Sequence, residues 1–74
     1  MPAPDMKGKH IVIQWRDSMA MGCLPFKRTV WAREYGEFKT LVEWTTEDPD
    51  DTCVEDSVAA CYALGAAQVD LRKD

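Results

Sequence analysis

The fold of this chain is decided by the stretch Arg28-Thr-Val-Trp-Ala-Arg-Glu-Tyr-Gly-Glu-Phe-Lys-Thr-Leu-Val-Glu-Trp-Thr45. Residues 28–35 and 38–45 both alternate between apolar and polar side chains, which is the period of a half-buried strand. Gly36 lies between them and supplies the positive φ that a tight turn favours. The stretch therefore predicts a β-hairpin. In its second strand, alternation places on one face Phe38, Thr40, Val42 and Trp44.

A further strand is predicted before this hairpin. Residues 9–15 are rich in β-branched side chains and alternate, so that Ile11, Ile13 and Trp15 share one face. Residues 16–26 then predict a long connection, and its part from Met19 to Phe26 is unusually apolar for a loop. Two interpretations of that loop stay open, because it either folds over the sheet as core or projects as an interface for a partner.

A helix is predicted after the hairpin. Thr52-Cys-Val-Glu55 matches the capping box that opens helices, and Gly65 is a natural helix end. The apolar stripe between them consists of Val54, Val58, Cys61 and Leu64. Residues 67–72 alternate again, which predicts a possible short fourth strand.

These elements define an α+β fold, in which a three-stranded antiparallel sheet carries one helix on one face. With 74 residues, of which 46% are hydrophobic, the chain can build one small core. We expect a single domain over residues 9–72, preceded by a flexible leader over residues 1–8. The oligomeric state and the strand order stay open.

The sequence also indicates the cellular compartment of the protein. Its longest uncharged stretch, from Ser18 to Phe26, is about half of what a membrane-spanning helix needs, and the N-terminus lacks the apolar segment of a signal peptide. The three cysteines are an odd number, and Cys53 and Cys61 stand too far apart on one helix for a disulfide. Reduced thiols predict a cytoplasmic protein with no membrane partner.

No catalytic residue, metal ligand or cofactor is predicted, and we expect that the protein is not an enzyme. The single histidine, His10, stands near the N-terminus without a sequence motif around it. If Asp48 began a calcium loop, the glycine required at its sixth position would be Cys53. The spacing of the cysteines matches no zinc motif, and the glycines match no phosphate-binding loop.

Charge is distributed unevenly along the chain, which has a net charge of −4. Residues 1–46 carry seven basic and five acidic side chains, whereas residues 47–74 carry two basic and eight acidic ones. The predicted acidic patch at the start of the helix comprises Glu47, Asp48, Asp50, Asp51, Glu55 and Asp56. Such a patch attracts basic surfaces, so the leading hypothesis is a protein-binding module whose partner is a protein with a basic surface.

In size, acidity and α+β layout, the chain resembles the small phage-encoded inhibitors of bacterial defence complexes, of the anti-CRISPR kind. The resemblance rests on Glu47-Asp-Pro-Asp-Asp51, on Glu55 and Asp56, and on three predicted strands followed by a helix over residues 9–65. It implies a phage protein that inhibits a nucleic-acid-handling partner, with carboxylates in the place of phosphates. The group shares no motif, so no residue role is implied.

An alternative site lies on the predicted hairpin. Alternation places Trp31, Arg33 and Tyr35 on one face, and Arg28 stands earlier in the same strand. Aromatic rings that stack on bases, beside cations that neutralise phosphates, are how many sheet faces bind single-stranded nucleic acid. This predicts a nucleic-acid-binding protein as the second hypothesis. A third is a structural subunit that associates with itself through an edge strand or the apolar loop.

Overall fold

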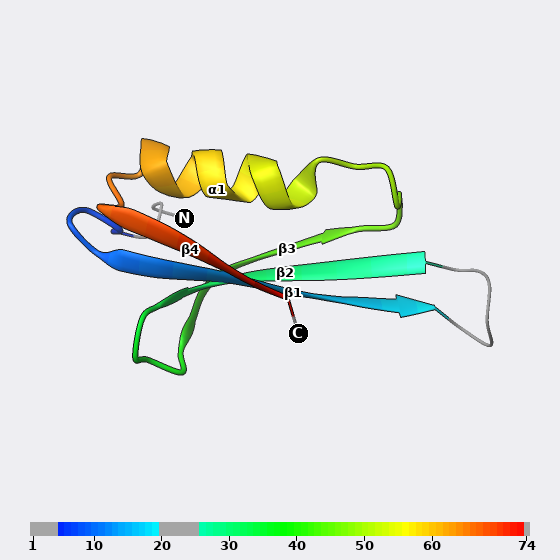
Figure 1. Ribbon diagram of the computed structural model, residues 1–74, viewed down its shortest axis with the longest axis horizontal. Coiled ribbons are helices and arrows are strands. Elements are labelled where there is room, and N and C mark those ends of the chain that lie inside the picture. Colours follow the sequence, from blue (N-terminus) through cyan, green and yellow to red (C-terminus); the bar gives the residue numbers. More distant parts are fainter. Residues whose placement is uncertain (1–4, 20–25, 74) are drawn as a thin grey trace.

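Four strands and one helix make up the part of the chain that the computed structural model describes, residues 5–19 and 26–73 (Figure 1). The elements are β1 (His10–Met19), β2 (Phe26–Glu34), β3 (Thr40–Thr46), α1 (Cys53–Ala63) and β4 (Gln68–Lys73). The predicted α+β fold is confirmed, with α1 packed on one face of the sheet. Most of the predicted apolar loop, residues 20–25, lies outside the described residues.

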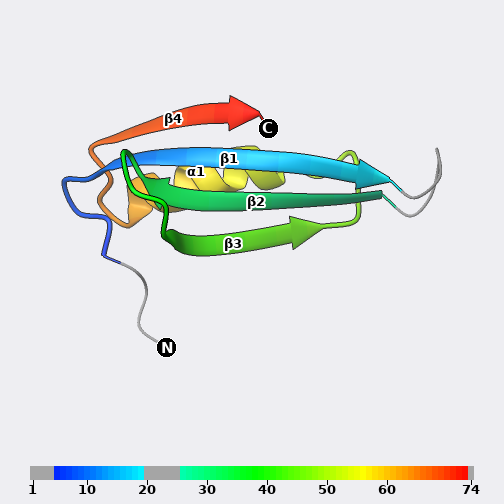
Figure 2. The same cartoon turned by 90° about the horizontal axis from the view of Figure 1, so that it is seen from below.

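The predicted fourth strand is present, and it makes the sheet mixed. The strand order is β3-β2-β1-β4, in which β1 pairs antiparallel with β2 and β2 pairs antiparallel with β3 (Figure 2). The chain leaves β3 at one edge, crosses the sheet as α1 and adds β4 at the other edge, parallel to β1. The three antiparallel strands are as predicted, whereas the parallel fourth strand depends on the crossover.

Strand β1 is longer than predicted, because residues 16–19 continue its pairing with β2 instead of starting a loop. Asp17 stands opposite Arg28, whose Nε donates to Asp17 Oδ1 at 2.6 Å and whose second amino group donates to Oδ2 at 3.0 Å. Both side chains are half-buried. A two-pronged ion pair of this kind satisfies their polar groups and fixes the strand register.

The core lies between α1 and the sheet face that alternation predicts. Ile11 and Ile13 from β1 and Val30 from β2 are fully buried there, and Cys61 covers them from the helix. Ser57 is also buried, although the predicted apolar stripe omits it, because its hydroxyl donates to the Val54 carbonyl at 2.6 Å. A short helix can bury a hydroxyl in this way without leaving it unsatisfied.

The hairpin between β2 and β3 forms as predicted, but the side-chain order of β3 differs. Glu37 donates its backbone N–H to the Glu34 carbonyl at 2.9 Å, and Gly36 adopts a φ of 84° in the turn. The register then shifts between Ala32 and Arg33, so that Val42 pairs with Ala32 while Thr40 pairs with Arg33. The prediction that Thr40 shares a face with Val42 is therefore wrong, because a β-bulge inserts one residue between them.

The two ends of α1 differ in how well the sequence predicts them. The Thr52 side chain does not cap the helix, because its hydroxyl donates to an Asp56 carboxylate oxygen at 3.1 Å. The hydrogen bond from the helix backbone to the Thr52 side chain that the predicted capping box requires is therefore not formed. The C-terminal end is as predicted. Gly65 has a φ of 98° and donates to the Tyr62 carbonyl, and Ala66 donates to the Cys61 carbonyl, which together form a Schellman motif.

The N-terminal segment packs against this helix end. Met6 is fully buried in the core, and the Gly8 N–H donates to the Gly65 carbonyl at 2.9 Å. A Cβ atom on Gly65 would lie 3.1 Å from the Lys7 Cα, so the close approach also requires glycine. The contacts of the domain therefore begin before residue 9, where the sequence predicts its start.

Candidate functional site

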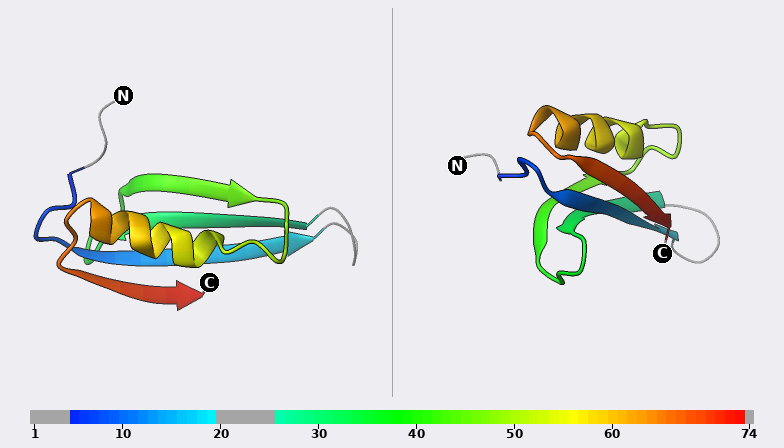
Figure 3. Two further views of the ribbon diagram at one scale, coloured as in Figure 1. Left: turned by 90° about the horizontal axis from the view of Figure 1, so that it is seen from above. Right: turned by 60° about the vertical axis from the view of Figure 1, so that its left-hand side comes forward.

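One face of the sheet is left open, because α1 covers the other (Figure 3). The paired registers place every second residue of each strand on this open face. Its charged and aromatic strand residues are His10, Arg16, Lys27, Trp31, Arg33, Glu43, Asp70 and Arg72, and its neutral polar residues include Gln14 and Thr29. The face thus carries four permanent cations against two carboxylates, although the whole chain is acidic.

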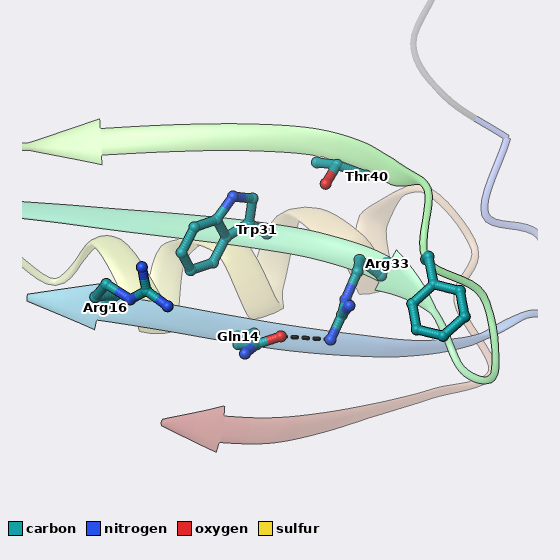
Figure 4. A pocket seen from close by; sticks show the side chains of 6 residues that line it. Gln14, Arg16, Trp31, Arg33 and Thr40 are labelled. Carbon is teal, nitrogen blue, oxygen red and sulfur yellow. Dashed lines mark hydrogen bonds between the residues drawn. The ribbon is translucent and has the colours of Figure 1, made fainter. Parts of the chain in front are cut away.

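A shallow pocket lies in the middle of the open face, lined by Gln14, Arg16, Trp31, Arg33, Phe38 and Thr40 (Figure 4). Its volume is about 200 Å³. Sites that enclose a whole drug-sized ligand measure roughly 300–1,000 Å³. The pocket is therefore of a size for one flat ring with its substituents, and not for a whole small metabolite.

The side chains in this pocket are held in place by the strands. Figure 4 shows the Trp31 ring over the sheet, flanked by the side chains of Arg16 and Arg33. The Arg33 guanidinium donates a hydrogen bond to Gln14 Oε1 across the β1–β2 pair. The half-buried Trp31 and the anchored Arg33 therefore form a ring platform with a cation beside it.

A second pocket adjoins the first toward the hairpin turn, and Arg33 and Phe38 line both. Tyr35 and Arg72 complete its aromatic and cationic lining. Phe38 is 91% exposed and Tyr35 is 65% exposed, which are high values for such large apolar rings. Exposed aromatic side chains beside cations make this surface a candidate binding site.

His10 supports the Tyr35 ring at the edge of this second pocket. The two rings stack with centroids 4.6 Å apart and planes 4° apart, and His10 Nε2 lies 2.6 Å from Asp70 Oδ2. The bond from His10, followed by a bond from Gln68, lowers the pKa of the Asp70 carboxyl below its usual value. The cluster joins β4 to the end of β2 and holds Tyr35 in position.

The structure brings together three of the four basic and aromatic residues that the sequence predicts. Trp31, Arg33 and Tyr35 lie on the open face, but Arg28 lies on the face that α1 covers. There it is bound by Asp17, whose pKa is lowered by the hydrogen bond from Arg28. Arg28 therefore lies apart from the other three predicted residues, on the opposite face of the sheet, where it pairs with Asp17.

The predicted acidic patch lies away from the open face, in the loop from β3 to α1 and in the first turn of the helix (Figure 1). All six of its side chains are exposed, namely Glu47, Asp48, Asp50, Asp51, Glu55 and Asp56. The loop is held by hydrogen bonds that join Thr46 to Asp51 at 2.8 Å and the Asp50 N–H to Asp48 Oδ1 at 2.9 Å.

These carboxylates change the expected chemistry of Cys53 at the start of α1. A helix N-terminus by itself favours the thiolate form of a cysteine. Instead, burial raises the pKa of the Cys53 thiol, and the charges of Asp51 and Asp56 raise it further. Cys61 is fully buried, and its pKa is also raised. Cys53 and Cys61 are free, and Cys23 lies outside the described residues.

Among the residues that line the two pockets, those that sequence reasoning missed include Gln14, Thr40 and Arg72. Gln14 stands on the polar side of β1, Thr40 was predicted to share a face with Val42, and Arg72 enters the open face because β4 pairs with β1. The alternation of β1 was a signal for Gln14. Neither the bulge that turns Thr40 outward nor the register of β4 has a comparable local signal.

Neither a metal centre nor a membrane span is found in the described part of the chain. Within residues 5–19 and 26–73, no group of three His, Cys, Asp or Glu side chains could hold a metal ion. No described helix is long and apolar enough to cross a membrane. Comparison of the chain with protein-family models, curated proteins and solved structures gives no match.

Proposed function

We propose that this protein is a small binding module, and not an enzyme, that holds single-stranded nucleic acid on its open sheet face. The observation that carries the proposal is the pair of adjoining pockets on that face, which share Arg33 and Phe38 and contain Trp31, Tyr35 and Arg72. Rings that stack on bases and cations that neutralise phosphates are the two requirements of such a surface. Because the acidic patch lies elsewhere, the net charge of −4 does not describe this face.

The spacing of the rings favours an extended strand of several nucleotides. Trp31 lies in β2 and Tyr35 directly follows its last residue; four residues of extended chain correspond to about 13 Å. Neighbouring nucleotides in a duplex strand rise by only about 3.4 Å, so one nucleotide cannot reach both rings. A duplex also hides the faces of its bases in its own stack, whereas a single strand can turn them toward the sheet.

The binding experiment uses the fluorescence anisotropy of a labelled short oligothymidylate over a series of salt concentrations. We expect affinity to fall linearly with salt on logarithmic axes, and the Arg72→Gln variant to flatten that slope by about 0.7 if it loses one phosphate contact. The matched control is Lys73→Gln, which removes the same charge from the next residue on the other face of β4. An affinity that does not depend on salt, or equal effects of both variants, would overturn the proposal.

A second candidate function rests on the acidic patch. Here we propose a cytoplasmic inhibitor, of the kind that the sequence resembles, that docks onto a protein with a basic surface. The hydrogen bonds that Asp48 and Asp51 make in the loop favour this candidate, because they hold the neighbouring carboxylates in one arrangement. A preorganised acidic surface can compete with nucleic acid for a basic protein.

The two candidates are separated by capture of binding proteins from a nuclease-treated lysate of the source cells. We expect the double variant Glu47→Gln/Asp50→Asn to lose any captured basic protein, because it removes two charges of the patch. Within the described part of the chain, the hydrogen bonds that hold the loop do not involve these two side chains. The control variant Glu37→Gln/Glu43→Gln removes the same charge elsewhere. If both variants capture the same proteins as the unmodified chain, the acidic patch is not the docking surface.

A further inference from the structure

We infer that the pocket around Trp31 prefers bases with a carbonyl oxygen at C6 of a purine or C4 of a pyrimidine, namely guanine, thymine and uracil, over adenine and cytosine, which carry an amino group there. This inference rests on the proposed function and names the chemistry that the same site selects. It follows from the polar groups that line the pocket, which are rich in hydrogen-bond donors.

Five of the six lining side chains, all except Phe38, carry at least one hydrogen-bond donor. Arginine has five N–H donors and no acceptor, and the indole of tryptophan has one donor and no acceptor. Arg16, Arg33 and Trp31 therefore offer donors alone, and Phe38 offers no polar group. Neither Asp nor Glu lines this pocket, whereas Glu34 and Glu37 line the adjoining one.

The orientation of Gln14 strengthens this bias. An arginine can only donate, so the Gln14 atom that meets Arg33 must be the amide oxygen Oε1. The amide nitrogen, with its two N–H donors, is then directed away from Arg33, as Figure 4 shows. The remaining acceptor capacity is the second lone pair of that oxygen and the hydroxyl of Thr40, which can equally donate.

A donor-rich pocket can discriminate between bases by the exocyclic group that they carry at one position, C6 of a purine or C4 of a pyrimidine. Guanine and uracil carry a carbonyl oxygen where adenine and cytosine carry an amino group, which needs an acceptor. A base stacked on Trp31 exposes this edge to the groups around the indole. A carbonyl base can accept from Arg33 or Gln14, while an amino base leaves its own donors opposite the donors of the protein, and a buried unpaired donor is costly.

The experiment compares pairs of single-stranded oligonucleotides whose bases differ in this exocyclic group and in the proton on the ring nitrogen beside it. Oligodeoxyuridylate is compared with oligodeoxycytidylate, and oligodeoxyinosinate with oligodeoxyadenylate, in the anisotropy assay at one salt concentration. We expect the carbonyl member of each pair to bind about fivefold more tightly or more, as for a good contact to a base edge. In Gln14→Glu, which keeps an acceptor for Arg33 but replaces the amide donors by an acceptor, this preference should shrink or reverse.

The outcomes separate this inference from the proposed function. Equal affinities within both pairs, with the Arg72→Gln effect on the salt slope retained, would overturn the base preference and leave the binding face standing. Tighter binding of the amino bases would overturn it as well. No binding of any of the four oligonucleotides would overturn both proposals.

Discussion

Trp31→Ala should weaken the binding of a short single-stranded oligonucleotide by about fivefold or more, since stacking of one base on an aromatic ring contributes roughly 1–3 kcal/mol. Trp31 is the tryptophan of the open face, at the centre of the first pocket. Trp15 and Trp44 pack against the core on the other face. Loss of the indole therefore removes the ring platform while the core stays filled, and the anisotropy assay measures the loss.

Two variants test whether stacking is the cause. Trp31→Phe keeps a ring, so most of the affinity should return, but the quenching of tryptophan emission by the oligonucleotide should disappear because Trp15 and Trp44 face the core. Circular dichroism should show that both variants stay folded, since Trp31 is not part of the core. An affinity of Trp31→Ala within twofold of the unmodified protein would contradict the stacking role.

The parts of the fold that sequence reasoning predicted have signals within a few residues. The hairpin follows from alternation on both sides of Gly36, and the end of α1 follows from Gly65, where a positive φ satisfies the last carbonyls of the helix. In contrast, the pairing of β4 with β1 joins residues about sixty positions apart. Local patterns cannot specify which edge of the sheet such a strand joins, or in which direction.

The same distinction holds for the candidate site. Trp31, Arg33 and Tyr35 could be grouped because every second residue of a strand faces the same way. The same rule places Arg28 on the opposite face of the strand. Arg28 was included in the predicted site because it stands close to the other three residues in the sequence. Arg72 could not be found, since its place beside Gln14 depends on the register of a parallel pair.

The distribution of charge between the two faces of the sheet cannot be read from the order of residues in the chain. Counted along the chain, the acidic half begins at Glu47, yet Arg72 from that half lies on the cationic open face. Asp17, from the more basic half, is bound to Arg28 beneath the helix. Folding thus sorts charges by face, so that an acidic chain can present a surface suited to a polyanion.

Met6→Ala should destabilise the domain by about 2–5 kcal/mol, the range for truncating a buried methionine to alanine. Met6 is fully buried in the main cluster, beside strands that sequence reasoning expected to begin after it. A domain of this size is stable by only a few kcal/mol. The variant is therefore expected to be partly or largely unfolded at room temperature, as urea denaturation followed by circular dichroism would show.

Met6→Leu is the matched control, because it keeps the apolar volume and should cost less than about 1.5 kcal/mol. Both variants leave the backbone hydrogen bond from the Gly8 N–H to the Gly65 carbonyl in place. The difference in stability between them therefore measures how much the Met6 side chain contributes by filling the core. If alanine were tolerated as well as leucine, Met6 would not contribute to the core in solution. The segment before β1 would then be a leader, and the cooperative domain would begin at β1.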